Sequence, residues 1–362
     1  MKYFTQELWD EEAFQRTAGN KARNDISQIL EENGFQGISV AVSPKDRHSQ
    51  NLLQKAAYHV YLRNKWKESL SVLQAGDTLL IQFPIVQHSV LLESVIAGVR
   101  KRGVKIILLI HDLEILRSAM RTDVSRREKI RLRLEEESLL RQSDALIVHN
   151  AKMREELAGM GYARGKMAVL GIFDYLIPET EEDRRYAKTS ADGPLIVAGV
   201  LRRHKAAYAY ALPDAPRYNL YGVDYEGEPK ENVTYHGSFP ADELPGVMEG
   251  SFGLVWDGDS VTTCSGTYGA YLRINNPHKV SLYLASGLPV MIWKEAALAE
   301  FVKKNGCGIP VGSLEEIPSV MDELSAQEYE ALREGACKVA RRLRAGRYTM
   351  RAVNKALERI GN

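Results

Sequence analysis

Two groups of cationic and amide side chains have the composition of a phosphate-binding site. The first is residues 275–279, NNPHK, which come directly before an apolar helical segment. Backbone N–H groups at a helix N-terminus attract anions, whereas a lysine in the first turn, here Lys279, opposes the helix dipole unless an anion binds there. Asn275 and Asn276 are typical capping residues, and Pro277 suits a first turn. The segment predicts a phosphate site; the alternative is that Asn276 only caps the helix and Lys279 faces solvent.

The second group follows an apolar run at 195–199. Gly199 allows a tight turn, and Arg202, Arg203 and Lys205 come next along the chain. Cations at the start of a helix oppose its dipole, so an anionic ligand there would relieve the conflict. A solvated loop with surface charge is the alternative.

A long polar segment, 256–274, precedes the NNPHK residues and contains three glycines and three aromatic residues. It is longer than a connection between two elements needs, and loops of this kind often contact ligands or act as lids. A surface loop without a function is the alternative. Its Asp257 and Asp259 superficially resemble an Asp-x-Asp metal site. We interpret them as part of a turn, with Asp257 near a ribose, and we predict no metal site.

A histidine and an aspartate follow the apolar run at 104–110. Asp112, oriented by His111, has the chemistry of a general base that removes a proton from a hydroxyl group. Asp112 as a simple helix cap is the alternative. His149 and Asn150 end a further apolar run, and a structural role suits His149 better than a catalytic one.

Two parallel sheets must position these side chains. Uniformly apolar runs alternate with amphipathic segments, which is typical of parallel strands covered by helices on both faces. Ligands of such sheets bind at the carboxyl ends of the strands, so we expect the site in the cleft shared by two domains. The predicted strands are 38–43, 78–83, 104–110, 145–149, 167–170, 195–199, 218–221, 233–236, 252–256, 289–293 and 308–311. The predicted helices include 51–73, 88–101, 126–141, 277–286 and 326–360.

The domain boundaries follow from composition. Residues 1–178 form a predicted N-terminal Rossmann-like domain, and 179–193 form a linker without any large aliphatic side chain. Residues 194–345 form a C-terminal Rossmann-like domain. Residues 346–362 form a C-terminal helix, which we expect to pack back on the N-terminal domain.

Composition excludes several classes of protein. The 362 residues carry a formal net charge of +1, which argues against a nucleic-acid-binding protein. Cys264, Cys307 and Cys337 are far apart and lack metal-ligand spacing, so a reducing cytoplasm fits them best. No apolar run reaches the roughly 18 residues that cross a bilayer. We expect a cytoplasmic homo-oligomer. Its basic segment 117–133 could also rest on the inner face of a membrane.

The second half of the chain resembles the nucleotide-binding half of GT-B glycosyltransferases. It is more narrowly similar to the family of glucosyltransferase 3 of adhesin glycosylation and of β-1,6-galactofuranosyltransferases. The first half agrees through HDLEILR and DALIVHNAKM. In the second half the matching segments, in the family's order, are VAGVLRRHK, YNLYGVDYEG, VTYHGSFPADELP, FGLVWDG, GTYGAYLRINNPHKVSLYLASGLPVMIW and GCGIPVGSLEEI.

The resemblance implies a fold and a set of site residues. The fold is GT-B, in which two Rossmann-like doubly wound domains face each other across a cleft, with C-terminal helices. Arg203 and Lys279 would bind the diphosphate, and Gly19 and Asn20 would approach the acceptor and the transferred sugar. The residues near the nucleotide would be Tyr221, Gly222, Tyr235 and Gly237. Many members have Asn at Val200 and Glu at Ala270, so the sugar and the stereochemistry stay open.

The resemblance also implies a reaction. The chain would be a metal-independent Leloir-type hexosyltransferase, with a UDP-sugar as donor substrate and no cofactor. It would move glucose or galactofuranose to a glycan, glycolipid or glycoprotein acceptor in cell-surface polysaccharide or glycoprotein synthesis. Helix N-termini and cations would then stabilise the leaving diphosphate. Two alternatives are a GT-B-fold sugar-nucleotide epimerase and a non-catalytic partner subunit that binds a sugar nucleotide.

Overall fold

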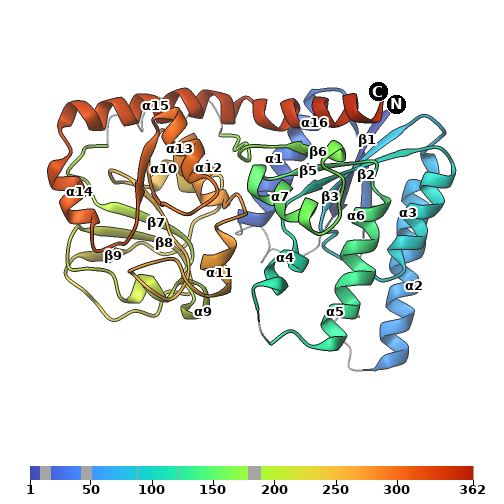
Figure 1. The fold of residues 1–362 in the computed structure, drawn as a ribbon, viewed down its shortest axis with the longest axis horizontal. Helices are drawn as coiled ribbons and strands as arrows, with labels where there is room; N and C mark the ends of the chain where they lie inside the picture. The colour runs from blue at the N-terminus through green and yellow to red at the C-terminus, as the bar shows by residue number, and fades with distance from the viewer. Residues whose placement is uncertain (9–17, 42–50, 88, 122, 178–188, 362) are drawn as a thin grey trace. The chain divides into compact units, whose positions relative to one another are not determined.

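The computed structural model describes residues 1–362 except 9–17, 42–50, 88, 122, 178–188 and 362 (Figure 1). Within it the chain divides into two compact units. The first consists of Met1–Glu12, Ile26–Leu170 and Met350–Asn362, and the second of Ala13–Asp25 and Gly171–Thr349. Most of the predicted linker, 179–193, lies outside the described residues. No helix in the described ranges is both long and apolar enough to cross a bilayer.

The first unit contains a parallel sheet with the strand order β2-β1-β3-β4-β5-β6. The prediction of a parallel sheet from uniformly apolar runs is confirmed, because β3, β4 and β5 are buried along almost their whole length. The strands are β1 (Lys2–Leu8), β2 (Gln36–Ala41), β3 (Thr78–Phe83), β4 (Lys105–Ile110), β5 (Ala145–Val148) and β6 (Met167–Val169).

Strand β1 was not predicted from the sequence. Its residues KYFTQEL are largely polar, and only Phe4 and Thr5 in the middle of the strand are buried. It nevertheless lies between β2 and β3 and pairs with both. A strand that is apolar over two residues gives no signal of periodicity, and its place in the sheet is decided by its neighbours.

Helices cover the sheet of the first unit. The predicted helix 126–141 is divided by a π-helical turn, η3 (Arg133–Glu137). The helices that lie wholly in this unit are α2 (Leu52–Ser69), α3 (Leu92–Lys101), α4 (Glu114–Ala119), α5 (Arg126–Leu132), α6 (Ser138–Gln142) and α7 (Ala151–Gly159). The helices α1 (Ala18–Glu32) and α16 (Arg347–Ile360) begin in the second unit and end in the first.

The second unit contains another parallel sheet, with the order β12-β11-β10-β7-β8-β9. The chain starts in the middle of this sheet at β7, moves outward to β9, and returns to the other side of β7 with β10. This is the doubly wound order that was predicted. The strands are β7 (Leu195–Val200), β8 (Tyr218–Val223), β9 (Val233–Tyr235), β10 (Gly253–Val255), β11 (Val290–Trp293) and β12 (Gly308–Val311).

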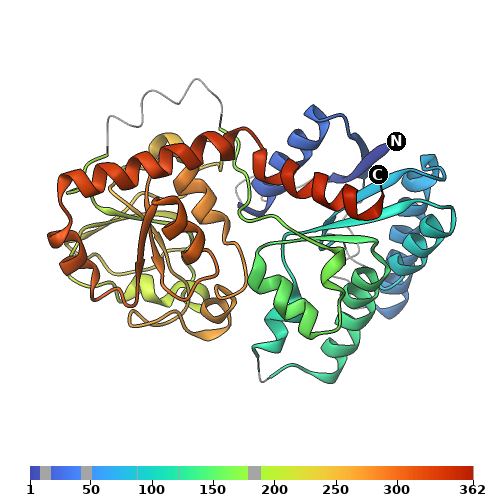
Figure 2. The same ribbon diagram turned by 45° about the horizontal axis from the view of Figure 1, so that its top comes forward.

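The helices of the second unit pack on this sheet, and Figure 2 shows the long α15 lying along the unit, where it contacts α12. The predicted single helix 326–360 is two helices, since it breaks between α15 and α16. The helices are α9 (Arg203–Ala206), α10 (Leu244–Val247), α11 (Gly266–Tyr271), α12 (His278–Ala285), α13 (Ala299–Asn305), α14 (Ile317–Glu323) and α15 (Ala326–Arg344).

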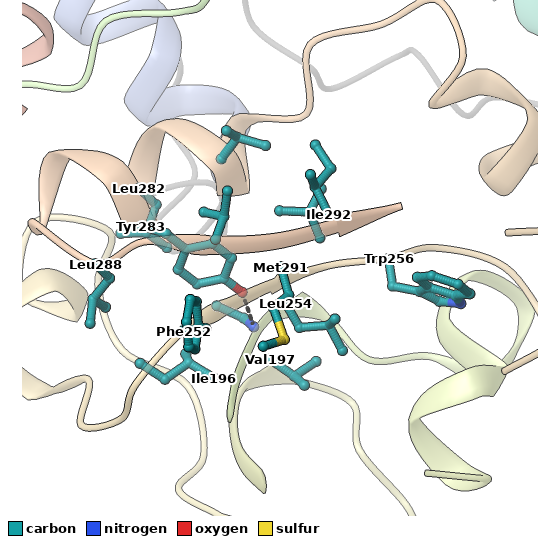
Figure 3. Packing of buried hydrophobic residues seen from close by; sticks show 14 of the residues in the cluster. Ile196, Val197, Phe252, Leu254, Trp256, Leu282, Tyr283, Leu288, Met291 and Ile292 are labelled. Carbon is teal, nitrogen blue, oxygen red and sulfur yellow. Dashed lines mark hydrogen bonds between the residues drawn. The ribbon is translucent and has the colours of Figure 1, made fainter. Parts of the chain in front are cut away.

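The core of the second unit fixes α12 against the sheet. Tyr283 of α12 points into the apolar side chains of the strands, and its hydroxyl oxygen accepts a hydrogen bond from the backbone N–H of Ala198 in β7 at 2.7 Å (Figure 3). A Cβ at Gly253 in β10 would overlap the ring of Tyr283. The position of α12 is therefore set by the Tyr283 ring, which packs directly on the backbone of β10 because residue 253 is a glycine.

Candidate functional site

The winding of the second sheet reverses between β7 and β10. A crevice opens at such a point at the carboxyl ends of the strands, and this is where doubly wound sheets bind ligands. Arg203 begins α9 just after β7, Asp257 follows β10, and Lys279 lies in the first turn of α12. The residues predicted to bind a diphosphate thus come from the elements that surround the reversal point.

Lys279 is held by two oxygens from the segment that follows β10. Its Nζ donates to the carbonyl oxygen of Trp256 at 2.9 Å and forms an ion pair with Oδ1 of Asp257 at 3.0 Å. Burial is the strongest single influence and would lower the pKa of Lys279, but the charge and hydrogen bond of Asp257, with smaller contributions from Tyr283 and Cys264, together raise the pKa above its ordinary value. Lys279 is therefore a fully charged ammonium group inside the protein. The alternative in which it faces solvent is wrong, since its side chain is only 14% exposed.

The expected cap at the start of α12 is wrong. Pro277, not an asparagine, occupies the N-cap position and makes no side-chain cap hydrogen bond. Asn276 is buried, and its Nδ2 donates instead to the carbonyl oxygen of Gly171 at 3.2 Å. Oδ1 of Asn275 is buried without a hydrogen-bond partner. The two amides therefore leave the N-terminal N–H groups of α12 uncapped by side chains, as an anion site requires.

The basic residues after β7 differ in their surroundings. Arg202 forms an ion pair with Asp224 at 2.6 Å. Arg203 is exposed, and its guanidinium lies 4.0 Å from the centre of the Tyr210 ring. Within the described ranges no carboxylate lies within ion-pair distance of Arg203, whereas Arg202 is neutralised. Of these two arginines, Arg203 is the one whose charge is available to a ligand.

Backbone contact brings the predicted nucleotide residues together at the ends of β7 and β8. Gly222 pairs with Gly199, and a Cβ at Gly222 would overlap the carbonyl oxygen of Gly199. Gly222 also donates its N–H to the carbonyl oxygen of Gly237 at 2.8 Å and accepts a hydrogen bond from the Tyr235 hydroxyl at 2.8 Å. Tyr221 is buried, with its ring stacked on His236 at 4.7 Å. Tyr221 thus supports the turn from within the core.

The segment 256–274 is more ordered than the predicted loop, because α11 forms inside it. Gly258 has a φ of +110° and its N–H donates to the carbonyl oxygen of Lys205 at 3.0 Å, which ties the segment to α9. Asp257 is engaged by Lys279, and Asp259 accepts a hydrogen bond from Ser265. Among the described residues, no group of three histidine, cysteine or acidic side chains is arranged to hold a metal ion.

The predicted base lies in the first unit. Asp112 follows β4; its Oδ1 accepts a hydrogen bond from the N–H of Leu113, and its Oδ2 forms an ion pair with Arg117. Nε2 of His111 lies 2.7 Å from Oε1 of Gln82 in β3. The contacts above therefore join the His111 side chain to Gln82 and the Asp112 side chain to Arg117, rather than to each other. The base role of Asp112 stays a prediction.

Sequence reasoning missed a buried carboxyl group beside Asp112. The two carboxylate oxygens of Glu136 accept hydrogen bonds from the N–H groups of Glu114 and Ile115, at 3.1 and 2.9 Å, and so cap α4. Burial raises the pKa of Glu136 to about 7, and the nearby Asp112 acts in the same direction. A simple helix cap was the alternative to the base role of Asp112. Glu136, which lies 22 residues after Glu114 in the sequence, caps α4 instead, and no local pattern signals it.

His149 has the structural role that suited it better than a catalytic one, and Asn150 has a structural role as well. His149 is buried, with Nε2 3.1 Å from the carbonyl oxygen of Ile110, and burial lowers its pKa to about 4. Asn150 caps α7, since its Oδ1 accepts a hydrogen bond from the N–H of Met153 at 3.0 Å.

Gly19 and Asn20 lie in the first turn of α1 rather than in a loop, and residues 9–17 before this helix are outside the described residues. This end of α1 belongs to the second unit. The next residue, Lys21, is buried in an ion pair with Asp25 that the sequence analysis did not single out. The available signal was the opposite charge four residues apart on one helix.

Comparison with known proteins gives consistent matches along the chain. The model of the glucosyltransferase 3-like N-terminal domain matches residues 2–172, and that of the glucosyltransferase 3-like C-terminal domain matches residues 195–356. β-1,6-galactofuranosyltransferase WbbI of Escherichia coli (strain K12) is 35% identical over 338 residues, which cover 92% of each chain. Glucosyltransferase 3 of Streptococcus gordonii is 25% identical over 342 residues, 94% of each chain.

Solved structures share the fold at low sequence identity. Anabaena Alr3699/HepE in complex with UDP aligns with a TM-score of 0.56 and 13% identity, over 99% of this chain and 100% of that one. The lipopolysaccharide outer core galactosyltransferase WaaB aligns with a TM-score of 0.57 and 10% identity, over 99% of both chains. Together with the two six-stranded parallel sheets, these likenesses confirm the predicted GT-B fold class.

Proposed function

The chain belongs to the glucosyltransferase 3-like family, and from this premise we propose that it transfers a hexose from a UDP-sugar to a glycan acceptor without a metal ion. It is a glycosyltransferase of the GT-B fold. The two relatives are named for galactofuranosyl and glucosyl transfer, so galactofuranose and glucose are the sugars that we propose. A glycan, glycolipid or glycoprotein of the cell surface is the proposed acceptor.

The ion pair of Lys279 with Asp257 at the start of α12 is the observation that carries this proposal. When a UDP-sugar reacts, negative charge gathers on the leaving diphosphate. Lys279 already holds its proton, and Asp257 and the Trp256 carbonyl hold its ammonium group in place. These contacts use two of its three N–H donors, so we propose that the third binds the diphosphate although the lysine is ion-paired. A charge that is oriented beforehand stabilises a leaving group without the cost of reorganisation. The amide dipoles of α12 act in the same direction, and the exposed Arg203 supplies a second cation.

The acceptor must lose a proton as the new bond forms. We propose that Asp112 accepts this proton, with its ion pair to Arg117 holding the carboxylate in a fixed orientation. A base must lie within hydrogen-bond reach of the hydroxyl group that it activates. We propose, from the resemblance to the family, that Gly19 and Asn20 in the first turn of α1 approach the acceptor and the transferred sugar.

The donor can be identified by thermal shift and by turnover. A panel of UDP-hexoses at one concentration should raise the melting temperature most for the true donor, because ligand binding stabilises the folded state in proportion to affinity. UDP and the donor should bind equally in EDTA and in Mg²⁺. Lys279→Met should lose the shift, whereas Lys65→Met, in an exposed ion pair on α2, should keep it.

Several outcomes would contradict the proposal. Undiminished UDP binding by Lys279→Met would place the donor elsewhere, and turnover that requires Mg²⁺ would exclude the metal-independent mechanism. A UDP-sugar converted to its epimer without any acceptor would show an epimerase. Binding without transfer to any glycan acceptor would indicate a non-catalytic partner subunit.

We also propose a cytoplasmic homo-oligomer that contacts the inner face of a membrane through α5 and the turn after it. Ile130 and Leu134 are 50% and 45% exposed, and the exposed Arg126, Arg127 and Arg133 surround them. Exposed aliphatic and basic side chains on one short stretch suit an anionic lipid surface. Cosedimentation with anionic vesicles tests the contact, since no binding at low salt would exclude it. Light scattering tests the oligomeric state.

A further inference from the structure

Lys21 near the start of α1 is a buried cation with three oxygen neighbours. Its side chain is 8% exposed, and its Nζ contacts three oxygens: Oδ1 of Asp25 at 2.5 Å, the carbonyl oxygen of Leu176 at 2.8 Å and Oδ1 of Asp242 at 2.8 Å. An ammonium group has three N–H donors. Two of these donors are used in hydrogen bonds to Asp25 and Leu176, and the ion pair with Asp242 adds a third contact, so the position of the Lys21 side chain is well defined.

The partners of Lys21 tie α1 to residues 171–177, GIFDYLI, which we call the connecting segment. The carboxylate of Asp25 accepts a hydrogen bond from the N–H of Leu176 at 3.0 Å, while Lys21 donates to the carbonyl of the same residue. Nζ of Lys21 also lies 5.0 Å from the centre of the Tyr175 ring. Lys21 and Asp25 of α1 thus bind the carbonyl and the N–H of Leu176, and Lys21 also lies over the ring of Tyr175.

The connecting segment is fastened to α12 at its other residues. Nδ2 of Asn276 donates to the carbonyl of Gly171, and the hydroxyl of Ser281 donates to the carbonyl of Phe173 at 2.7 Å. The ring of His278 lies 5.1 Å from that of Tyr175. Three residues of the α12 region therefore bind the same segment that Lys21 and Asp25 bind.

All these residues belong to the second unit, which contains Ala13–Asp25 and Gly171–Thr349. The first turn of α1 carries Asn20, proposed on the acceptor side, and the first turn of α12 carries Lys279, proposed on the donor side. The two turns are joined by buried and partly buried hydrogen bonds of 2.5 to 3.2 Å through the connecting segment. Contacts of this kind fix a relative position more strictly than apolar packing does, because hydrogen bonds are directional.

We propose that Lys21 is a positioning residue for sugar transfer: through the connecting segment it holds the first turn of α1 in register with the first turn of α12. The inference rests on the proposed function, to which it adds a residue that binds neither donor nor acceptor. Within the described residues, Lys21 contacts neither Lys279 nor Asp257, so the diphosphate site keeps its own hydrogen bonds when Lys21 is changed. Loss of Lys21 should therefore affect transfer far more than UDP binding.

Kinetics and binding together test this role. Lys21→Met should lower kcat for transfer by at least about tenfold, since small errors in the placement of reacting groups are costly. UDP affinity measured by calorimetry should change by less than about twofold. Lys21→Arg should restore part of kcat, because it can keep the contact with Asp25. The matched control Lys65→Met removes an exposed lysine from α2 and should behave as wild type.

Stability must be separated from positioning, because Lys21→Met leaves the buried Asp25 without its cation. The double variant Lys21→Met/Asp25→Asn removes both charges and keeps an acceptor for the N–H of Leu176. It should fold and still show the loss of kcat. A folded double variant with wild-type kcat would overturn the proposal. Loss of UDP affinity in parallel with kcat would also overturn it, since Lys21 would then only support the donor site.

Hydrogen exchange tests the connection without any substrate. In the double variant, backbone amides of residues 19–25 and of 276–285 should both exchange roughly tenfold faster, while those of α2 should not change. Faster exchange in 19–25 alone would show that α1 is not held in register with α12, and would refute the inference. A wild-type protein that binds no UDP-sugar would refute the proposed function instead, and the exchange result would still decide the connection.

Discussion

Removing the ammonium group of Lys279 should destabilise the second unit as well as its donor site. The side chains of Lys279 and Asp257 are 14% and 10% exposed, so Lys279→Met leaves a carboxylate almost fully buried without its cation. Breaking a buried pair in this way costs about 3–5 kcal/mol. The hydrogen bond to the Trp256 carbonyl is lost as well, and we expect a total at the upper end of that range.

The double variant Lys279→Met/Asp257→Asn should recover much of this loss, because no charge is then left buried. We expect the loss of unfolding free energy in the double variant to be smaller than the sum of the losses in the two single variants by about 2–3 kcal/mol. Urea unfolding of the four proteins at pH 7.5 measures this, with the transition of the second unit followed separately if two transitions appear.

UDP calorimetry on the same four proteins separates the two roles of Lys279. The double variant should be nearly as stable as wild type and should still fail to bind UDP, because the cation is absent from the start of α12. A destabilisation below about 1 kcal/mol for Lys279→Met would show that the ion pair is not buried in solution. Tight UDP binding by a stable double variant would refute the assignment of the diphosphate to this helix.

Three further predictions concern other parts of the chain. Gly253→Ala should destabilise the protein by at least about 3 kcal/mol in urea unfolding, because the new Cβ overlaps the Tyr283 ring; a loss under 1 kcal/mol would contradict the packing. Asp112→Asn should bind UDP normally and transfer at least about 10²-fold more slowly, and normal turnover would remove Asp112 from the mechanism. Burial, and to a smaller extent the charge of Lys21, lower the pKa of His278 to about 3 in the folded state. The neutral ring therefore contributes its full stabilisation above pH 6.5, and this stabilisation is lost as the pH falls below 6.5. Between pH 7 and pH 5 that loss is about 2 kcal/mol, and His278→Gln should lack it; an equal pH dependence in both proteins would show that His278 is protonated in the fold.

The sequence by itself determined the two parallel sheets and the general position of the donor site. Strands β3 and β12 were predicted at their observed ends. Strand β3 is buried along its whole length, as expected of a parallel strand covered on both faces, whereas β12 is a partly buried edge strand. The NNPHK residues signalled a helix start with a cation in its first turn, and Lys279 lies there. These features depend on residues close together in the chain, so their pattern is readable without the fold.

Only the tertiary structure decided which polar groups meet. Lys279 pairs with Asp257, Glu136 caps α4, and Asn276 binds Gly171 instead of capping its own helix. Lys21 reaches Leu176 across 155 positions of sequence. Strand β1 belongs with these cases, since its polar residues join the sheet only because β2 and β3 lie on either side. The partner of a buried polar group is chosen by the path of the backbone through space, and residues far apart in sequence carry no local pattern that reveals it.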